Sequence, residues 1–329
     1  LSISKTSDPL GQWWNYKIDA TVDGAKQTFN WADYPSLGVD AQALYVTANM
    51  FQFDNEFAYA KIRVIPKDGP YSGGAVKFRD FVKMKNIDGT FAFTIQPSHT
   101  YGAPGAQYMV SSFFPEGDQL SLWTITNPTG AAKLTMKSIT VSPYSLPPNA
   151  TQKGGGATML ETGDVRVLNA VFRGGSVWCA LTTTHDFGGG NVAAIHWFQI
   201  NPSAGTLVQQ GIYGSDGLHY SFPAVAPDSN GNMTMVFSRS GANEFISIYY
   251  TGRKASDPPG ILQGSALLKA GIANFVKLDS SGKNRWGDYA GISSDPADSL
   301  RVWFYSMYAE AKNAQGESAW GTQIGSTKF

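Results

Sequence analysis

The sequence predicts an all-β protein built as a β-propeller of six or seven four-stranded blades. Three observations predict it: helical periodicity is almost absent, many short apolar segments end at Gly, Pro, Asn or Asp, and two motifs recur about every 60 residues. Radial closure of such repeats leaves few exposed sheet edges, so a propeller accommodates many short strands. A pair of β-sandwiches is the alternative architecture.

Eight segments have the length and composition of strands. Their apolar and β-branched residues lie between turn-forming residues, which is typical of antiparallel meanders. The segments are 43–51, 59–65, 120–125, 176–182, 194–200, 233–238, 245–251 and 300–308. The single cysteine, Cys179, lies within the fourth of them, so we expect a buried thiol without a disulfide.

The composition of the 329 residues limits the classes of function. The chain has 25 Lys plus Arg and 25 Asp plus Glu, so its formal net charge is zero. Binding to nucleic acid or to an anionic membrane needs clustered basic residues, so neither partner is expected. The hydrophobic share of 42% is too high for a disordered chain, and no apolar run is long enough to span a membrane.

One recurring motif is a turn of the type Ser/Thr, Asp/Asn, Pro, any residue, Gly. The Asx side chain bonds the backbone just after it, Pro fixes φ and Gly accepts a positive φ. We therefore expect each copy to join the third and fourth strands of a blade. Copies occur at 7–11, 126–130 and 256–260, with a longer variant at 201–205 and a looser turn at 66–69.

A second motif recurs at a different phase and predicts the first strand of a blade. Segments 31–40, 220–228 and 286–295 align, with a single gap in the second, and an apolar strand follows each. This phase divides residues 1–329, taken as one domain, into blades at 1–20 (incomplete), 30–90, 90–145, 160–213, 219–272 and 285–329. We expect an upstream segment or a second chain to supply the missing strands.

Some of these residues resemble known propellers. The segment Thr6-x-Asp8-x-x-Gly11-x-Trp13 resembles the Asp-box turn of sialidase-like propellers, with one additional residue before the glycine. Segments 4–9, 33–40 with 47–51, 285–289 and 320–325 are similar to a group of secreted bacterial propeller proteins, mostly without assigned function. The resemblance covers most of the chain. It implies a propeller fold and a secreted, extracellular or cell-surface location, with no agreed activity.

The resemblance to sialidases does not extend to their catalytic residues. That family binds a substrate carboxylate with three arginines and uses a Tyr–Glu pair and an Asp acid. No motif in this chain brings three arginines together. No catalytic residue is therefore transferred, and the sequence leaves open whether the protein is an enzyme.

In propellers the first strand of each blade begins at the mouth of the central channel, where ligands usually bind. Aromatic faces stack on sugar rings, while Asp and Arg bind hydroxyl or carboxylate groups. The predicted ligand-binding residues are Trp31, Tyr34, His99, Arg166, His219, Arg285, Trp286 and Tyr289, with Tyr101 and Tyr220 beside them. They favour an exported recognition module that binds carbohydrate or another extracellular polymer.

Two alternatives remain open. The first is a glycan-cleaving enzyme of sialidase-like propeller type, in which Asp33 and Asp288 act as an acid and base pair. However, the second motif recurs in three blades, and a repeated motif favours a repeated structural role. In that role the carboxylates would accept backbone N–H bonds that hold adjacent blades together. The second is a structural role in a larger surface assembly, which predicts an exposed apolar patch on a flank or open edge.

No cofactor or metal is expected. The four histidines, His99, His185, His196 and His219, do not have metal-ligand spacing. The segment Asp228-x-Asn230-x-Asn232 resembles the first half of a calcium loop but lacks the later Glu. It therefore predicts a turn, with structural calcium as the alternative.

Overall fold

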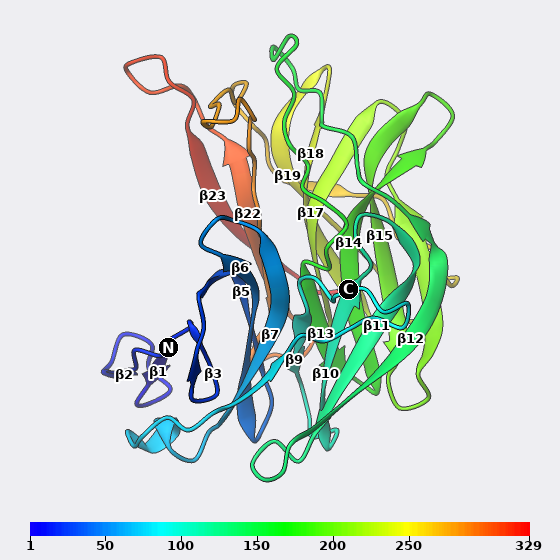
Figure 1. Ribbon diagram of the computed structural model, residues 1–329. Helices are drawn as coiled ribbons and strands as arrows, with labels where there is room; N and C mark the ends of the chain where they lie inside the picture. The colour runs from blue at the N-terminus through cyan, green and yellow to red at the C-terminus, as the bar shows by residue number, and fades with distance from the viewer. The chain divides into compact units, whose positions relative to one another are not determined.

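The computed structural model describes residues 1–329 and is all-β (Figure 1). It contains 23 strands and one turn of 3-10 helix, η1 (Pro70–Ser72). The expectation of an all-β chain is confirmed. No helix has the length and hydropathy needed to cross a membrane. The residues divide into two compact units, a first unit (residues 1–112 and 121–138) and a second unit (residues 113–120 and 139–329).

The first unit contains two short hairpins and a four-stranded antiparallel sheet. The hairpins are β1 (Ser2–Ser4) with β2 (Trp13–Asn15), and β3 (Val22–Asp23) with β4 (Lys26–Gln27). The sheet runs in order through β5 (Asn30–Val39), β6 (Ala43–Gln52), β7 (Phe57–Pro66) and β8 (Arg79–Val82).

A second set of four strands follows. It comprises β9 (Gln96–Thr100), β10 (Ala106–Ser112), β11 (Gly117–Thr126) and β12 (Lys133–Tyr144), each paired with the next in sequence. The strands β5 and β9, each the first of its set, lie parallel at Val39 and His99. The first strands of two successive sets are therefore neighbours.

The second unit contains three antiparallel sheets in sequence order. The first is β13 (Asn169–Arg173), β14 (Ser176–Asp186), β15 (Asn191–Asn201) and β16 (Thr206–Tyr213). The second is β17 (Leu218–Pro227), β18 (Met233–Gly241), β19 (Glu244–Arg253) and β20 (Ala266–Lys269). The third has three strands, β21 (Gly291–Ser294), β22 (Val302–Ala309) and β23 (Trp320–Thr327).

The strand set agrees closely with the repeats in the sequence. Each of the eight predicted segments lies on a strand, namely β6, β7, β11, β14, β15, β18, β19 and β22. The recurring turns at 126–130, 201–205 and 256–260 each join the third and fourth strands of a set. The count of six or seven blades and their closure into a ring remain predictions.

The second motif marks a backbone irregularity in two of its three copies. Tyr34 and Phe222 both have φ of 52°, each stands before a proline, and the strand register shifts there in β5 and in β17. The third copy differs: residues 285–289 do not lie on a strand, because β21 begins only at Gly291. The expected first strand over 286–295 is therefore confirmed only in its second half, since the positive φ values of Gly287 and Asp288 interrupt the extended chain before it.

Large side chains fill the spaces between the sheets of the second unit. Trp178 and Trp197 pack with Tyr220 and Phe237, between the β13–β16 and β17–β20 sheets. A further cluster, which includes Phe222, Ile246, Phe275, Trp286 and Ala309, joins the β17–β20 and β21–β23 sheets. The three sheets therefore pack face to face in succession, as neighbouring blades would. Cys179 is fully buried here, and burial raises its pKa.

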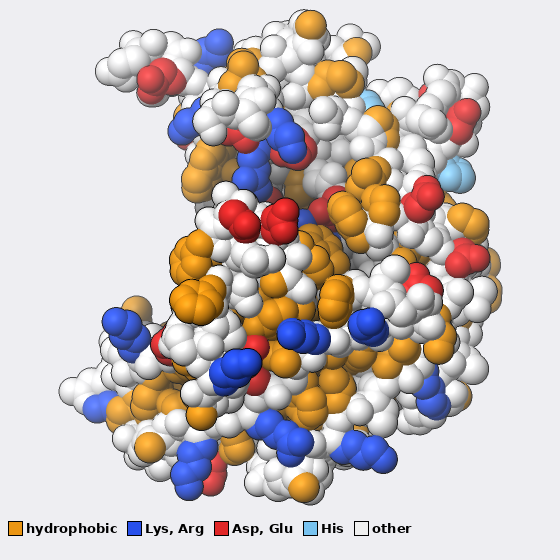
Figure 2. Space-filling view, viewed as in Figure 1, with side chains coloured by type: hydrophobic (Ala, Val, Ile, Leu, Met, Phe, Trp, Pro, Cys, Tyr) orange, Lys and Arg blue, Asp and Glu red, His pale blue; other side chains and the backbone are white.

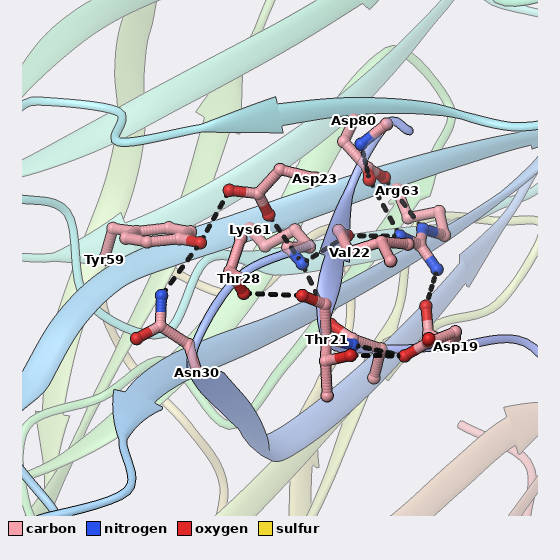
Figure 3. A network of polar contacts seen from close by, with 12 residues as sticks. Asp19, Thr21, Val22, Asp23, Thr28, Asn30, Tyr59, Lys61, Arg63 and Asp80 are labelled. Carbon is pink, nitrogen blue, oxygen red and sulfur yellow. Dashed lines mark hydrogen bonds and ion pairs between the residues drawn. The ribbon is translucent and has the colours of Figure 1, made fainter. Parts of the chain in front are cut away.

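A buried ionic network holds residues 19–23 against the sheet of the first unit (Figure 3). Lys61 and Arg63, on β7, are each about 4% exposed. Arg63 forms a bidentate pair with Asp80, with both N–O distances at 2.8 Å. Lys61 pairs with Asp23 at 2.7 Å, and that carboxylate also accepts a bond from the Tyr59 hydroxyl at 2.6 Å. Burial, together with this bond, raises the pKa of Tyr59 to about 12.

Both cations also bind main-chain oxygens of the same segment. Arg63 donates to the carbonyls of Asp19 and Val22, and Lys61 donates to those of Ala20 and Val22. The donors of the two buried cations are thus satisfied by carboxylates and by backbone.

The buried His196 makes the stability of the protein depend on pH. Its Nε2 bonds the Gln210 side-chain oxygen at 3.0 Å, while its Nδ1 is buried without a partner. Burial lowers its pKa from 6.5 to about 4, so the unfolded chain binds a proton at pH values where the native chain does not.

Because the unfolded chain takes up this proton first, the free energy of unfolding has its full value above pH 6.5 and falls as the pH drops toward 4. We expect the free energy of unfolding to fall by about 2–3 kcal/mol between pH 7 and pH 4.5. Urea titrations at the two pH values measure it. The variant His196→Gln retains a donor to Gln210 and should lose the part of the pH dependence that His196 contributes, while His99 and His219, whose pKa values desolvation also lowers, keep theirs. An unchanged pH profile in the variant would show that other groups carry it.

Candidate ligand-binding site

The predicted ligand-binding residues of the first unit lie on β5 and beside β9. The Trp31 ring stacks on Phe51 with centroids 5.5 Å apart, and its Nε1 donates to the Gln52 carbonyl. His99 is exposed and stacks on Tyr101 at 5.1 Å. Tyr34 lies at the bulge of β5, and the Asp33 side chain beside it is exposed. His99 is level with Val39 at the end of β5, whereas Trp31 lies at its start, so the Trp31–Phe51 and His99–Tyr101 stacks are separate and the structure does not bring them together.

Among the predicted residues of the second unit, several contact the protein itself. Arg166 forms a bidentate pair with Asp164 at 2.7 and 2.8 Å. His219 is buried, and its Nδ1 accepts a bond from the Ala193 N–H at 3.2 Å. Burial lowers the pKa of His219. Tyr220 is also buried and packs on Phe237.

Three other predicted residues, Arg285, Trp286 and Asp288, line one hollow of about 450 Å³. We call it the Trp286 hollow; its lining residues are Phe275, Lys277, Leu278, Asp279, Arg285, Trp286, Gly287, Asp288, Met307 and Trp320. Trp286 is only 3% exposed and forms part of the wall, whereas Trp320 is 54% exposed. Tyr289, next in sequence to Asp288, is also exposed. The hollow thus combines an exposed indole with charged groups.

The charged groups of the Trp286 hollow form a small ionic network. The Arg285 guanidinium lies 3.0 Å from the Asp288 carboxylate and 3.7 Å from that of Glu161. Glu161 lies 3.6 Å from Lys283. A neighbouring hollow of about 480 Å³ is lined by Glu161 and Lys283 and shares Leu278 with the first. The two hollows therefore adjoin at Leu278, and their linings together contain three carboxylates and three cations.

The backbone around Asp288 has an unusual conformation. Gly287 has φ of 69°, and a Cβ at this position would lie 2.8 Å from the Phe222 ring, so only glycine fits. Asp288 has φ of 142°, which a residue with a side chain rarely adopts. Such strained positions persist where the surrounding structure enforces them, and they cluster at ligand-binding sites.

Several residues of this site could not be predicted from sequence patterns. Lys277 and Met307, which line the Trp286 hollow, and Glu161, which lines the neighbouring hollow, belong to none of the recurring motifs. Trp320 did appear in a segment similar to secreted propellers, but nothing in that segment pointed to a ligand. Its place at the start of β23, opposite Ala309 of β22, brings it to the hollow.

Two further motifs of the sequence form turns. The Asp228 Oδ1 accepts bonds from the backbone N–H groups of Asn230 and Asn232, and its Oδ2 accepts one from the Asn232 amide. This is the turn predicted for that segment. The Asp186 Oδ1 accepts bonds from Gly188 N–H and Gly190 N–H, and these bonds lower its pKa.

Exposed side chains of both charges, with hydrophobic side chains between them, are visible on one face of the molecule (Figure 2). In the third sheet of the second unit, Trp303 and Tyr305 of β22 and Ile324 of β23 are all exposed. Tyr305 pairs with Ile324, and Trp303 lies two residues from Tyr305, so the three share one face. This is an apolar patch of the kind that a role in a surface assembly predicts.

Comparison with known proteins gives similarity to solved structures only. No family model and no curated protein match the chain. A protein of unknown function from Dyadobacter fermentans is 8% identical with a TM-score of 0.49, over 92% of this chain and 83% of that one.

Two glycan-cleaving enzymes are similar at a lower TM-score. The catalytic domain of a GH62 alpha-L-arabinofuranosidase from Coprinopsis cinerea is 12% identical with a TM-score of 0.38, over 94% and 92% of the two chains. A GH43_1 enzyme from Xanthomonas citri is 11% identical with a TM-score of 0.41, over 90% and 87%. With every TM-score below 0.5, no activity is transferred from these proteins to this chain.

Proposed function

We propose that the protein is an exported recognition module that binds carbohydrate in the Trp286 hollow. The observation that carries this proposal is the exposed Trp320 indole beside the Arg285–Asp288 ion pair in one hollow of about 450 Å³. That volume is within the range of small-molecule sites, about 300–1,000 Å³.

The chemistry of the hollow fits a sugar ring. The apolar face of a pyranose or furanose packs on an indole, and its hydroxyls both donate and accept hydrogen bonds. Asp288 in this hollow and Glu161 in the neighbouring one supply acceptors, while Arg285 and Lys277 supply donors. Charge-assisted bonds are the stronger class, so a network of both signs can orient several hydroxyls at once.

Replacing the exposed indole tests the proposal. We expect Trp320→Ala to weaken glycan binding by about tenfold or more, because aromatic anchors carry a large share of binding energy. A glycan array identifies the ligand, and calorimetry gives the affinities. The matched control is Trp303→Ala, since Trp303 is similarly exposed but pairs with Ser326 at the other end of β22. Equal loss in both variants, or no bound glycan at all, would contradict the proposal.

A second candidate function is glycan cleavage at the same hollow. Its supporting observation is that Asp288 and Glu161 both contact the Arg285 guanidinium, which places two carboxylates near each other. A general acid, however, needs an apolar setting away from cations, and both of these carboxylates lie beside one. Asp33, the other carboxyl of the predicted catalytic pair, belongs to the first unit. Binding is therefore the primary proposal.

Product analysis separates the two functions. Wild-type protein and the variants Asp288→Asn and Glu161→Gln are incubated with the glycans that bind, and released reducing ends are measured. Cleavage by the wild type that both variants lose would establish hydrolysis at this site. Binding without release of reducing ends would rule it out.

A further inference from the structure

A second cavity in the second unit, of about 190 Å³, lies at the opposite strand ends from the Trp286 hollow. Arg173 and Arg253, the last residues of β13 and β19, line it. Arg173 donates to Ser294, the last residue of β21, at 2.8 Å. The Trp286 hollow instead lies before the first residue of β21. The two sites are thus separated by the length of the strands.

The hydrogen-bond acceptors that line this cavity are already used. The Gln209 side-chain oxygen accepts from the Gly260 N–H, and its amide donates to the Gln199 oxygen at 2.6 Å. The Gln199 amide in turn donates to Ser176 Oγ at 2.9 Å. This chain of bonds leaves the Ser176 O–H and the second N–H of each amide as donors.

The one carboxylate in the lining is also occupied. Asp228 accepts three bonds from its own turn, through both of its oxygens. The nearby Asp257 carboxylate accepts bonds from the Lys254 N–H and the Gln263 amide. The cavity therefore presents an excess of donors over acceptors.

Arg253 is a buried cation that forms no direct ion pair, although the Asp257 charge acts on it at longer range. Its residue is 3% exposed, its Nη2 donates to the Asp257 main-chain oxygen at 2.7 Å, and its Nε has no hydrogen-bond partner. No carboxylate oxygen lies within 4 Å of its guanidinium. Burial of a cation is costly unless a counter-charge accompanies it.

We propose that this cavity, which we call the Arg253 cavity, binds a small oxyanion. A tetrahedral anion or a carboxylate group would supply the missing counter-charge for Arg253 and accept from the Ser176 hydroxyl and the glutamine amides. The anion is either a free inorganic ion or the acidic group of a sugar. The proposal does not depend on carbohydrate binding in the Trp286 hollow.

Calorimetric titration of the full chain tests the proposal. The probes are sodium sulfate, sodium phosphate and sodium glucuronate, each at an ionic strength held constant with sodium chloride. We expect saturable binding of at least one probe to the wild type. Arg253→Met should weaken it by about tenfold or more, and Ser176→Ala by about threefold. Binding of glucuronate alone would identify an acidic sugar as the ligand, and binding of sulfate or phosphate would identify an inorganic ion.

Two controls make the result specific. Arg301→Met removes an arginine of the same unit that pairs with Asp298 at the surface, and it should leave the affinity unchanged. Trp320→Ala, which alters the Trp286 hollow, should also bind the anion normally. If Arg253→Met does not fold, the Ser176→Ala affinity decides. No saturable binding to the wild type, unchanged affinity in the decisive variant, or loss of binding in Trp320→Ala would overturn the proposal.

Discussion

Asp80→Ala is expected to lower the free energy of unfolding by about 3–5 kcal/mol, because it leaves the buried Arg63 guanidinium without its counter-charge. The Asp80 side chain is 3% exposed and that of Arg63 is 5% exposed, so water cannot replace the lost carboxylate. Breaking a buried pair from one side costs far more than the net stabilisation by the intact pair. Urea titration followed by tryptophan fluorescence measures the change.

Two companion variants separate the charge effect from a general effect of substitution. Asp33→Ala alters an exposed aspartate of the same unit and should change stability by less than about 0.5 kcal/mol. The double variant Asp80→Leu with Arg63→Met removes both charges and should be more stable than Asp80→Ala. If the double variant were the less stable of the two, the uncompensated charge would not explain the loss.

Trp286→Ala is expected to cost about 3–5 kcal/mol of folding free energy, in the range for a buried tryptophan. The indole packs edge-on against Phe275 with centroids 5.0 Å apart, and its Nε1 donates to Ser238. It belongs to the apolar cluster that joins the β17–β20 and β21–β23 sheets. Removing it leaves a cavity between two sheets, and thermal unfolding detects the loss.

The contrast with Trp320 makes this prediction specific. Trp320→Ala removes an indole that is 54% exposed and should change stability by less than about 1 kcal/mol while it weakens glycan binding. Both tryptophans line one hollow, but Trp286 is buried and supports the packing of the sheets, whereas Trp320 is exposed and can contact a ligand. A Trp286→Ala protein of normal stability would show that the indole does not support the packing of the sheets.

The apolar segments of the sequence were sufficient to predict eight of the 23 strands. The turns near Asn127 and Pro258 join the strands that their phase predicts, because Asx, Pro and Gly each favour a defined turn geometry regardless of distant residues. Failure came at residues 285–289, where alignment to two strand segments suggested a third. Positive φ at Gly287 and Asp288 interrupts the strand there, and the Phe222 ring that excludes a side chain at Gly287 comes from a distant part of the chain, which no local pattern encodes.

The site was predictable only in part, because local sequence patterns do not encode contacts between distant parts of the chain. Arg285, Trp286 and Asp288 are adjacent in sequence, so a motif could identify them together. Glu161 joins them from more than a hundred residues away, through two weak ion contacts that depend on the fold of the second unit. The burial of His219 and the ion pair of Arg166 with Asp164 also become visible only in the folded structure. Residue type alone marked these as ligand-binding, whereas the structure shows their contacts within the protein.

The network around Arg63 has a consequence for how this protein can change in evolution. Lys61 and Arg63 bind the main-chain oxygens of Asp19, Ala20 and Val22, which every amino acid carries. Ala20 and Val22 are therefore free to drift without loss of these bonds, while the two basic residues on β7 are constrained together. We expect a library randomised at 20 and 22 to yield mostly folded proteins, and one randomised at 61 and 63 to yield few.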